Sequence, residues 1–305
     1  MNAPGTQNLI AMVYDFDGTL SPDNMQERTI LNAYGLDKED FWRRARDLVD
    51  GRGYERTLAY LKILLYDPAF QKEPLTPELL ASLAAEHIRY FNGVEDFFER
   101  VNNFLGSIPE ATDHGVVIEH YIISSGLKEL LEGCSIARYF KKMYACEFEY
   151  FGGRPVFPKL VINDTNKTQF LFRINKGMLE LSEDINSHMP AEERRVPFRN
   201  MIYIGDGTTD IPSMTVVQRS GGHAIAVFDP EAAGGVPSEI RSMVADGRAD
   251  HFAPADYSED QLLMKIIKKA IRKIVQEIAY RASSDRSRDW VERNPGVPDP
   301  GTGHG

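Results

Sequence analysis

The chain is poor in cysteine and has no long uninterrupted run of apolar residues. Cys134 and Cys146 are the only cysteines among its 305 residues, and their spacing fits neither a disulfide framework nor a cysteine-rich metal site. No apolar segment approaches the roughly 18 residues that a membrane-spanning helix needs. Residues 1–7 also lack the basic and apolar regions of a secretory signal. We therefore expect a cytoplasmic protein without a membrane partner.

The chain also lacks an excess of positive charge. Its formal net charge is −10, which disfavours a general binder of polyanions such as nucleic acids. Apolar residues make up 42% of the composition and charged residues 26%, so a sizeable core can form. We find no internal repeat, and the length allows one large domain or two smaller ones.

Two aspartates follow the first apolar segment of the chain. Residues 9–14 are mostly apolar and predict a buried strand, and Asp15, Asp17, Gly18 and Thr19 come directly after it. The carboxyl end of such a strand is where open α/β sheets bind ligands. Two carboxylates crowded there repel each other unless they share a cation or a proton. A strand that ends in an ordinary Asp-Gly turn gives the same pattern, so this motif alone leaves both interpretations open.

A second predicted strand ends in hydroxyl side chains. Residues 116–123 are largely apolar and run directly into Ser124, Ser125 and Gly126 before a predicted helix. This order places hydroxyls and backbone N–H groups at a helix start, where an anion can bind. Ser-Ser-Gly is also a common turn, so the segment gains weight only from its position among the other motifs.

A lysine and two further aspartates complete the set of candidate residues. Lys167 lies in the first turn of a predicted helix, where a positive charge opposes the helix dipole unless it has an anionic partner. Lys176 is a competing candidate about 13 Å further along that helix. A third strand, 201–204, leads into a glycine-flanked Asp206, and Asp210 follows near the next helix start.

The segment between the first two motifs is helical in pattern. From residue 23 to residue 90 we find helical periodicity and no convincing strand. The segment carries basic side chains that could contact a substrate anion or form a solvated helix face: Arg43, Arg44, Arg46, Arg52 and Arg56. Gly51 and Gly53 favour a loop near Arg52 and Arg56, which makes these two the preferred candidates for substrate contact.

The remaining segments are predicted from their patterns alone. We expect a β-hairpin over 146–151 and 155–161, a polar surface excursion over 182–200, and short strands over 224–228 and 249–252. Residues 259–280 predict an amphipathic helix whose lysines and arginines form a solvated face or weakly contact anionic surfaces. The Ser/Arg/Asp-rich and Gly/Pro-rich tail, 283–305, predicts disorder.

Taken in order, the four motifs resemble those of the haloacid dehalogenase (HAD) superfamily, and most closely its phosphoserine-phosphatase-like branch. The resemblance covers roughly residues 9–22 and 91–255. It implies an α/β fold in which a three-layer Rossmann-like core with a central parallel sheet carries a helical cap inserted after the first motif. The implied core is 1–22 and 91–282, and the implied cap is 23–90.

The resemblance also implies residue roles. Asp15 would be the nucleophile that forms an aspartyl-phosphate, and Asp17 the general acid and then base. Mg²⁺ would bind the Asp15 carboxylate, the Asp17 carbonyl oxygen and Asp206, with Asp210 in support. The implied phosphate-binding residues are Ser124, Ser125, Gly126 and Lys167. An aspartate at position 17 favours hydrolysis of a phosphomonoester over the other reactions of the superfamily.

Two departures from the branch argue against phosphoserine as the substrate. Leu61, with Lys62 beside it, aligns with the cap arginine that receives the substrate carboxylate, and Thr209 stands where the branch usually has asparagine. We therefore expect a Mg²⁺-dependent phosphatase for another small phosphorylated metabolite. The alternatives are a non-catalytic HAD-fold binding or scaffold protein that engages a partner through its basic C-terminal helix, and a HAD phosphotransferase.

Overall fold

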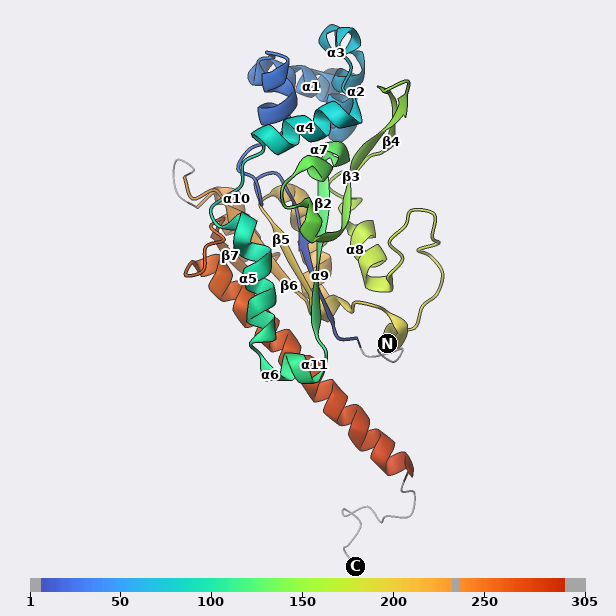
Figure 1. The fold of residues 1–305 in the computed structure, drawn as a ribbon, viewed down its shortest axis with the longest axis vertical. Helices are drawn as coiled ribbons and strands as arrows, with labels where there is room; N and C mark the ends of the chain where they lie inside the picture. The colour runs from blue at the N-terminus through green and yellow to red at the C-terminus, as the bar shows by residue number, and fades with distance from the viewer. Residues whose placement is uncertain (1–6, 232–235, 294–305) are drawn as a thin grey trace, which may run out of the picture.

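A computed structural model of the chain, which describes residues 7–231 and 236–293, shows an α/β fold built on one central sheet (Figure 1). Seven strands lie in the order β4-β3-β2-β1-β5-β6-β7, and every neighbouring pair except β3 and β4 is parallel. The predicted fold class is thereby confirmed. The strands are β1 (Leu9–Tyr14), β2 (Val117–Leu127), β3 (Phe140–Phe151), β4 (Arg154–Leu160), β5 (Met201–Gly205), β6 (His223–Phe228) and β7 (His251–Pro254).

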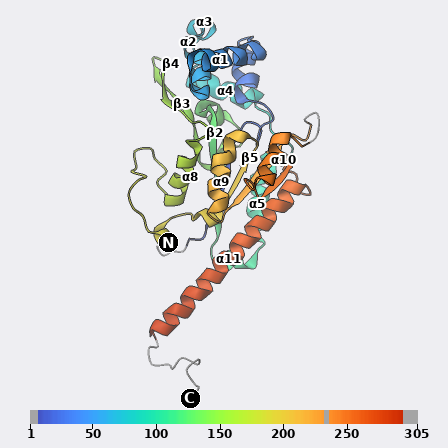
Figure 2. The same cartoon turned by 180° about the vertical axis from the view of Figure 1, so that it is seen from behind.

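Helices cover both faces of this sheet. The helices α5 and α11 contact each other on one face, and α8 and α9 contact each other on the opposite face (Figures 1 and 2). The α-helices are α1 (Lys38–Arg52), α2 (Arg56–Tyr66), α3 (Pro68–Lys72), α4 (Pro77–His87), α5 (Val94–Gly106), α6 (Pro109–Asp113), α7 (Lys128–Gly133), α8 (Lys167–Lys176), α9 (Ile211–Arg219), α10 (Ser238–Ala245) and α11 (Leu262–Arg293). Single helical turns are η1 (Glu27–Leu31), η2 (Ala137–Tyr139), η3 (Ala191–Glu193), η4 (Phe198–Asn200) and η5 (Thr208–Asp210).

The first strand lies inside the sheet because its side chains are apolar on both faces. It pairs with β2 on one side and β5 on the other, and its residues from Ile10 to Tyr14 are fully buried. The hydroxyl of Tyr14 lies 2.9 Å from Nδ1 of His120 on β2, and its ring contacts Phe97 and Phe98 of α5 edge-on. These contacts fix the carboxyl end of β1, from which Asp15 emerges.

Residues 23–90 form helices and contain no strand, as their periodicity predicts. The helices α1 to α4 gather beyond the carboxyl ends of β1 and β2 (Figure 1). Local signals set their ends: the Thr76 side chain caps α4 by accepting from the N–H of Leu79, and Gly53 ends α1 in the left-handed conformation at φ 70°. The division of the chain into a catalytic core and a cap stays a prediction.

Three details differ from the sequence-based expectations. Arg52 is the last residue of α1, since Gly53 alone ends the helix there, and so it does not lie in a loop. The hairpin strand begins at Phe140, because residues 140–144 add a parallel pairing with β2 despite the two lysines at 141 and 142.

The third difference concerns the C-terminal tail. Disorder is wrong for residues 283–293, which continue α11 to Arg293, because this stretch contains neither glycine nor proline. Residues 294–305 lie outside the described part of the chain. Among the described residues, no helix combines the length and the apolar character required to cross a bilayer.

The predicted polar excursion lies largely on the surface and is anchored at its C-terminal end. Residues 182–200 contain only two single helical turns. The guanidinium of Arg195 forms a forked ion pair with Glu119 on β2, and Lys176 of α8 donates hydrogen bonds to the carbonyls of Ile185 and Ser187 in the first half of the excursion. The excursion is therefore attached to both the sheet and the helix that begins with Lys167.

Helix α4 and helix α7 approach each other closely at Gly133. A Cβ atom at this position would lie 2.2 Å from the carbonyl oxygen of Ala81. We predict that Gly133→Ala lowers the free energy of unfolding by about 1–3 kcal/mol because the helices must separate. Gly106→Ala, at the end of α5 with nothing within 4 Å of its added Cβ, is the control and should be neutral or stabilising. Urea unfolding measures both, and equal effects would contradict the close contact.

Candidate active site

Asp15 lies directly at the carboxyl end of β1. Its N–H donates to the carbonyl of Ile204 on β5 at 3.0 Å, so the residue still belongs to the sheet edge. The residue is 6% exposed. Its Oδ1 accepts from the N–H of Phe16 at 2.8 Å, and its Oδ2 lies 2.9 Å from Nζ of Lys167. Both carboxylate oxygens are therefore held in place.

Lys167 is the first residue of α8 and is 1% exposed. Its Nζ lies 2.9 Å from Asp15 Oδ2 and 2.8 Å from Asp210 Oδ1. Burial disfavours the charged form, but the two carboxylates outweigh it and hold the pKa of Lys167 well above its ordinary value. The competing Lys176 donates instead to the carbonyls of Ile185 and Ser187. The structure thus brings Lys167, and not Lys176, to Asp15.

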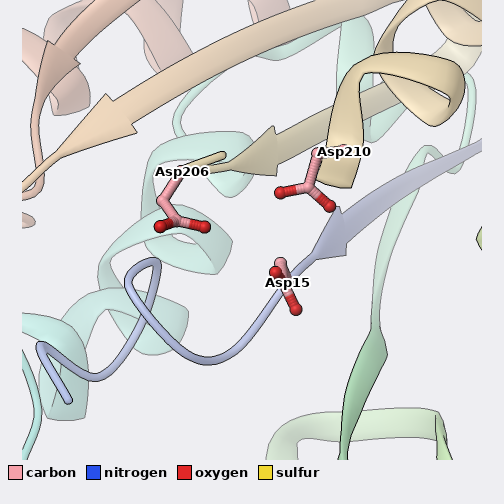
Figure 3. A group of neighbouring side chains, drawn as sticks. All are labelled: Asp15, Asp206 and Asp210. Carbon is pink, nitrogen blue, oxygen red and sulfur yellow. The ribbon is translucent and has the colours of Figure 1, made fainter. Parts of the chain in front are cut away.

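Asp206 and Asp210 converge on Asp15 from the loop after β5 (Figure 3). One carboxylate oxygen from each of the three residues lies within 4.8 Å of the others. Asp210 is fully buried, and its Oδ1 accepts from Lys167 and from the hydroxyl of Tyr203 at 2.7 Å. Its Oδ2 is buried without a hydrogen-bond partner among the described residues. One lysine thus faces three carboxylates.

The electrostatics of this cluster favour a bound cation. Burial raises the pKa of Asp15 to about 6, with Lys167 opposing the shift and Asp210 adding to it. Burial, and then the charge of Asp15, raise the pKa of Asp206 well above its usual range. Carboxylate oxygens are the ligands that Mg²⁺ prefers, and a divalent cation would relieve the repulsion. The donor set, including the unpartnered oxygen of Asp210, therefore fits the predicted magnesium ion.

Two glycines make this convergence possible. A Cβ atom on Gly18 would lie 2.1 Å from Oδ2 of Asp206, and a Cβ atom on Gly205 would lie 2.3 Å from Oδ2 of Asp210. Gly18 also has φ 74°, a conformation that other residues rarely adopt. The glycines of the first and fourth motifs therefore allow the carboxylates to approach the main chain.

Asp17 faces residues 23–90 rather than the three-carboxylate cluster. Its Oδ1 accepts from the N–H of Met25 at 2.8 Å. Burial, followed by the charge of Asp15, raises the pKa of Asp17 well above its usual range, so the side chain tends to keep a proton. The carboxylate is not one of the three that converge, and the expected role of its main-chain carbonyl in metal binding stays a prediction.

The second motif is fixed from two sides. The hydroxyl oxygen of Ser124 accepts from the N–H of Gly126 at 3.0 Å, and Ser124 is almost fully buried. The carbonyl of Ser125 accepts from the hydroxyl of Tyr60 on α2 at 2.6 Å. A Cβ atom on Gly126 would lie 2.2 Å from Cε of Met25. The glycine therefore allows Met25, in the segment 23–90, to pack directly against the motif.

The arginines of residues 23–90 do not take part in this cluster. Arg43 is paired with Asp40 and Asp47, and Arg44 with Asp67. The other three are exposed: Arg46, Arg52 and Arg56. Among the described residues, no ion pair or hydrogen bond joins any of the five to a motif residue. The structure therefore gives the preferred pair, Arg52 and Arg56, no contact with the site.

Sequence reasoning missed three residues that contact the motifs: Tyr203, Tyr60 and Met25. A tyrosine in the middle of a buried strand needs a partner for its hydroxyl, which is a signal that could have identified Tyr203. Tyr60 and Met25 are separated from their partners by many residues, and their pattern is that of ordinary helix residues. No local signal distinguishes them.

We predict that Gly18→Ala abolishes magnesium binding. The added Cβ would displace Asp206, whose carboxylate oxygen lies 2.1 Å from the position of that atom. Wild-type protein should gain about 2.7 kcal/mol of stability with Mg²⁺ at about 100 times its Kd. Gly35→Ala is the matched control, since it has the same strain at φ 60° but nothing within 4 Å. Thermal unfolding with and without Mg²⁺ decides, and a normal magnesium shift in Gly18→Ala would contradict the geometry.

We predict that Lys167→Met destabilises the metal-free protein in a pH-dependent way. Without the ammonium, the folded-state pKa of Asp15 rises further above its unfolded value, so stability is lost as the pH increases. The cost should be small at pH 5 and reach about 3–5 kcal/mol at pH 8. Lys176→Met is the control, because the partners of Lys176 are uncharged carbonyls. Urea unfolding in EDTA at both pH values measures the loss in free energy of unfolding. An equal loss at pH 5 and pH 8 in Lys167→Met would contradict the prediction.

No protein-family model matches the chain. An uncharacterized protein of Borreliella burgdorferi is 28% identical over 290 residues, which correspond to 87% of this chain and 97% of that protein. A HAD family hydrolase of Salmonella enterica serovar Typhi superimposes with a TM-score of 0.53 at 15% identity, covering 80% of this chain and 66% of the hydrolase. The chain thus spans just under two thirds of that hydrolase.

Two phosphoserine phosphatase structures are also similar. One is a phospho-aspartyl intermediate analogue, with a TM-score of 0.51 at 14% identity, covering 86% of this chain and 99% of that one. The other is a substrate-bound complex, with a TM-score of 0.51 at 16% identity, covering 85% of this chain and 97% of that one. Identities this low establish the fold alone. The chain therefore has the fold of the HAD hydrolases, in its phosphoserine-phosphatase-like form.

Proposed function

We propose that the protein is a Mg²⁺-dependent phosphatase that hydrolyses a small phosphorylated metabolite in the cytoplasm through an aspartyl-phosphate intermediate. The observation that carries this proposal is the buried ammonium of Lys167 between Asp15 and Asp210. A lysine in this place orients a strand-end carboxylate and offers positive charge to an incoming phosphate. The fold shared with a phosphoserine phosphatase studied as a phospho-aspartyl intermediate analogue supports the same chemistry.

In the first step, a carboxylate oxygen of Asp15 attacks phosphorus. The new O–P bond forms as the bond between phosphorus and the ester oxygen breaks. Asp17 gives its proton to the leaving oxygen, and its raised pKa suits this role. In the second step, Asp17 takes a proton from water and the water oxygen attacks phosphorus. The bond between phosphorus and Asp15 breaks, which releases phosphate and regenerates the Asp15 carboxylate. Lys167 balances the negative charge throughout.

Other residues hold the phosphate and the metal. The Ser124–Gly126 segment and Lys167 would bind the phosphate oxygens by their hydroxyl, N–H and ammonium groups. Asp15, Asp206 and the main-chain carbonyl of Asp17 would hold Mg²⁺, with Asp210 in support. When bound, the ion supplies positive charge to the phosphate oxygens.

Hydrolysis of 4-nitrophenyl phosphate tests the proposal. We predict turnover with Mg²⁺, its loss in EDTA and its recovery when Mg²⁺ is restored, because three carboxylates cannot receive a phosphate dianion without a cation. Activity is measured by release of 4-nitrophenol. Absence of turnover on a broad panel of phosphate esters would favour a non-catalytic binding protein instead, and full activity after exhaustive chelation would remove the magnesium assignment.

The two aspartates of the first motif should have separable effects. Asp15→Asn removes the nucleophile and should leave only background hydrolysis, with no phosphoenzyme. Asp17→Asn keeps the shape but cannot transfer a proton, which should slow turnover by about 10²–10⁴-fold. Rapid-quench labelling with a radioactive phosphate ester measures the intermediate. A hydroxylamine-sensitive phosphoenzyme in the Asp15→Asn variant would show that another residue is the nucleophile.

A further inference from the structure

Gln26 has a buried side-chain oxygen without a hydrogen-bond donor. The residue is 3% exposed, and its Oε1 has no partner among the described residues. Gln26 precedes the helical turn η1 directly, yet its side chain does not cap that turn. A buried acceptor left unpaired costs about 1–3 kcal/mol, so native proteins rarely keep one without a reason.

The position of Gln26 connects it to two motifs. The preceding residue, Met25, donates its N–H to the carboxylate of Asp17. The side chain of Gln26 lies beside Tyr60, whose hydroxyl donates to the carbonyl of Ser125. Gln26 is thus joined through Met25 to the proton donor and through Tyr60 to the phosphate-binding segment, and Oε1 is its unpaired acceptor.

The segment that contains Gln26 carries no buried positive charge. Within residues 23–90, all of which the structure describes, the buried polar side chains are Gln26, Thr29, Thr57 and Asp67. Asp67 is already paired with Arg44. A leaving group with a carboxylate would therefore find no buried cation in this segment to pair with. An uncharged leaving group avoids the cost of burying an unpaired charge.

We propose that Gln26 determines specificity for the leaving alcohol by accepting a hydrogen bond from it through Oε1. The substrate class is then a phosphomonoester of an uncharged alcohol with a further hydrogen-bond donor, such as a second hydroxyl group. This inference rests on the proposed phosphatase function and specifies its substrate.

Three phosphate esters with the same three-carbon chain separate the contributions. Glycerol 3-phosphate carries neutral hydroxyls, 3-phosphoglycerate has a carboxylate in place of the terminal hydroxyl, and n-propyl phosphate has no hydroxyl. We expect kcat/KM for glycerol 3-phosphate to exceed that for each of the other two esters by at least about 10-fold. A factor of this size is the effect expected from one hydrogen bond gained or from one unpaired buried charge avoided. Equal values for the three esters would overturn the proposal.

The variant Gln26→Met removes the acceptor at similar size. It should lower kcat/KM for glycerol 3-phosphate by about 10–100-fold and leave n-propyl phosphate and 4-nitrophenyl phosphate unchanged. Gln276→Met, at an exposed position of α11, is the control and should behave as wild type. Because Oε1 has no partner, Gln26→Met should not lower the melting temperature. A lower melting temperature with equal losses on all esters would assign Gln26 a structural role and overturn the proposal.

Binding to the Asp15→Asn variant distinguishes failure of this inference from failure of the proposed function. Calorimetry with Mg²⁺ measures the Kd of glycerol 3-phosphate and of 3-phosphoglycerate without turnover. Tighter binding of glycerol 3-phosphate that Gln26→Met abolishes would support the specificity role even if the wild-type protein hydrolysed no ester. Hydrolysis by the wild type together with equal Kd values would retain the phosphatase and overturn the role of Gln26.

Discussion

The ion pairs of Lys167 are the interaction on which the rest of the site depends. A buried ammonium is costly in isolation, and so are the two carboxylates that it joins. The ammonium is tolerated because both carboxylates lie 2.8–2.9 Å from it, and each carboxylate is tolerated because it pairs with the ammonium. This contact ties the start of α8 to the ends of β1 and β5, so the register of the sheet and the position of α8 must both be correct before the site exists.

The three-carboxylate cluster is the second constraint, and it works against stability. Lys167 neutralises part of the charge of Asp15, Asp206 and Asp210, and the rest is held only because Gly18 and Gly205 let the carboxylates approach the main chain. Such an arrangement favours a ligand that brings positive charge. The repulsion lowers the stability of the metal-free fold, and the proposed magnesium ion would restore part of it.

The sequence was informative where function is carried by short local patterns. Strand-end aspartates, a glycine-flanked loop and a lysine at a helix start are each visible within a few residues, and their order indicated the fold. The structure then placed Lys167, and not Lys176, beside Asp15. Contacts between distant segments were not visible: Tyr60 reaches Ser125 across 65 positions. The expected loop at Arg52 was wrong, because Gly51 lies within α1 and only Gly53 ends the helix.

We propose that Asp15 is the nucleophile, that Lys167 orients it, and that a metal ion supplies positive charge beside it. A crystal structure with Mg²⁺ and beryllofluoride, a mimic of an acyl phosphate, tests this most directly. We predict beryllium bonded to a carboxylate oxygen of Asp15, a fluoride within hydrogen-bond distance of Lys167, and Mg²⁺ bound by Asp15 and Asp206. Beryllofluoride on another residue, or Mg²⁺ bound away from these two aspartates, would contradict it.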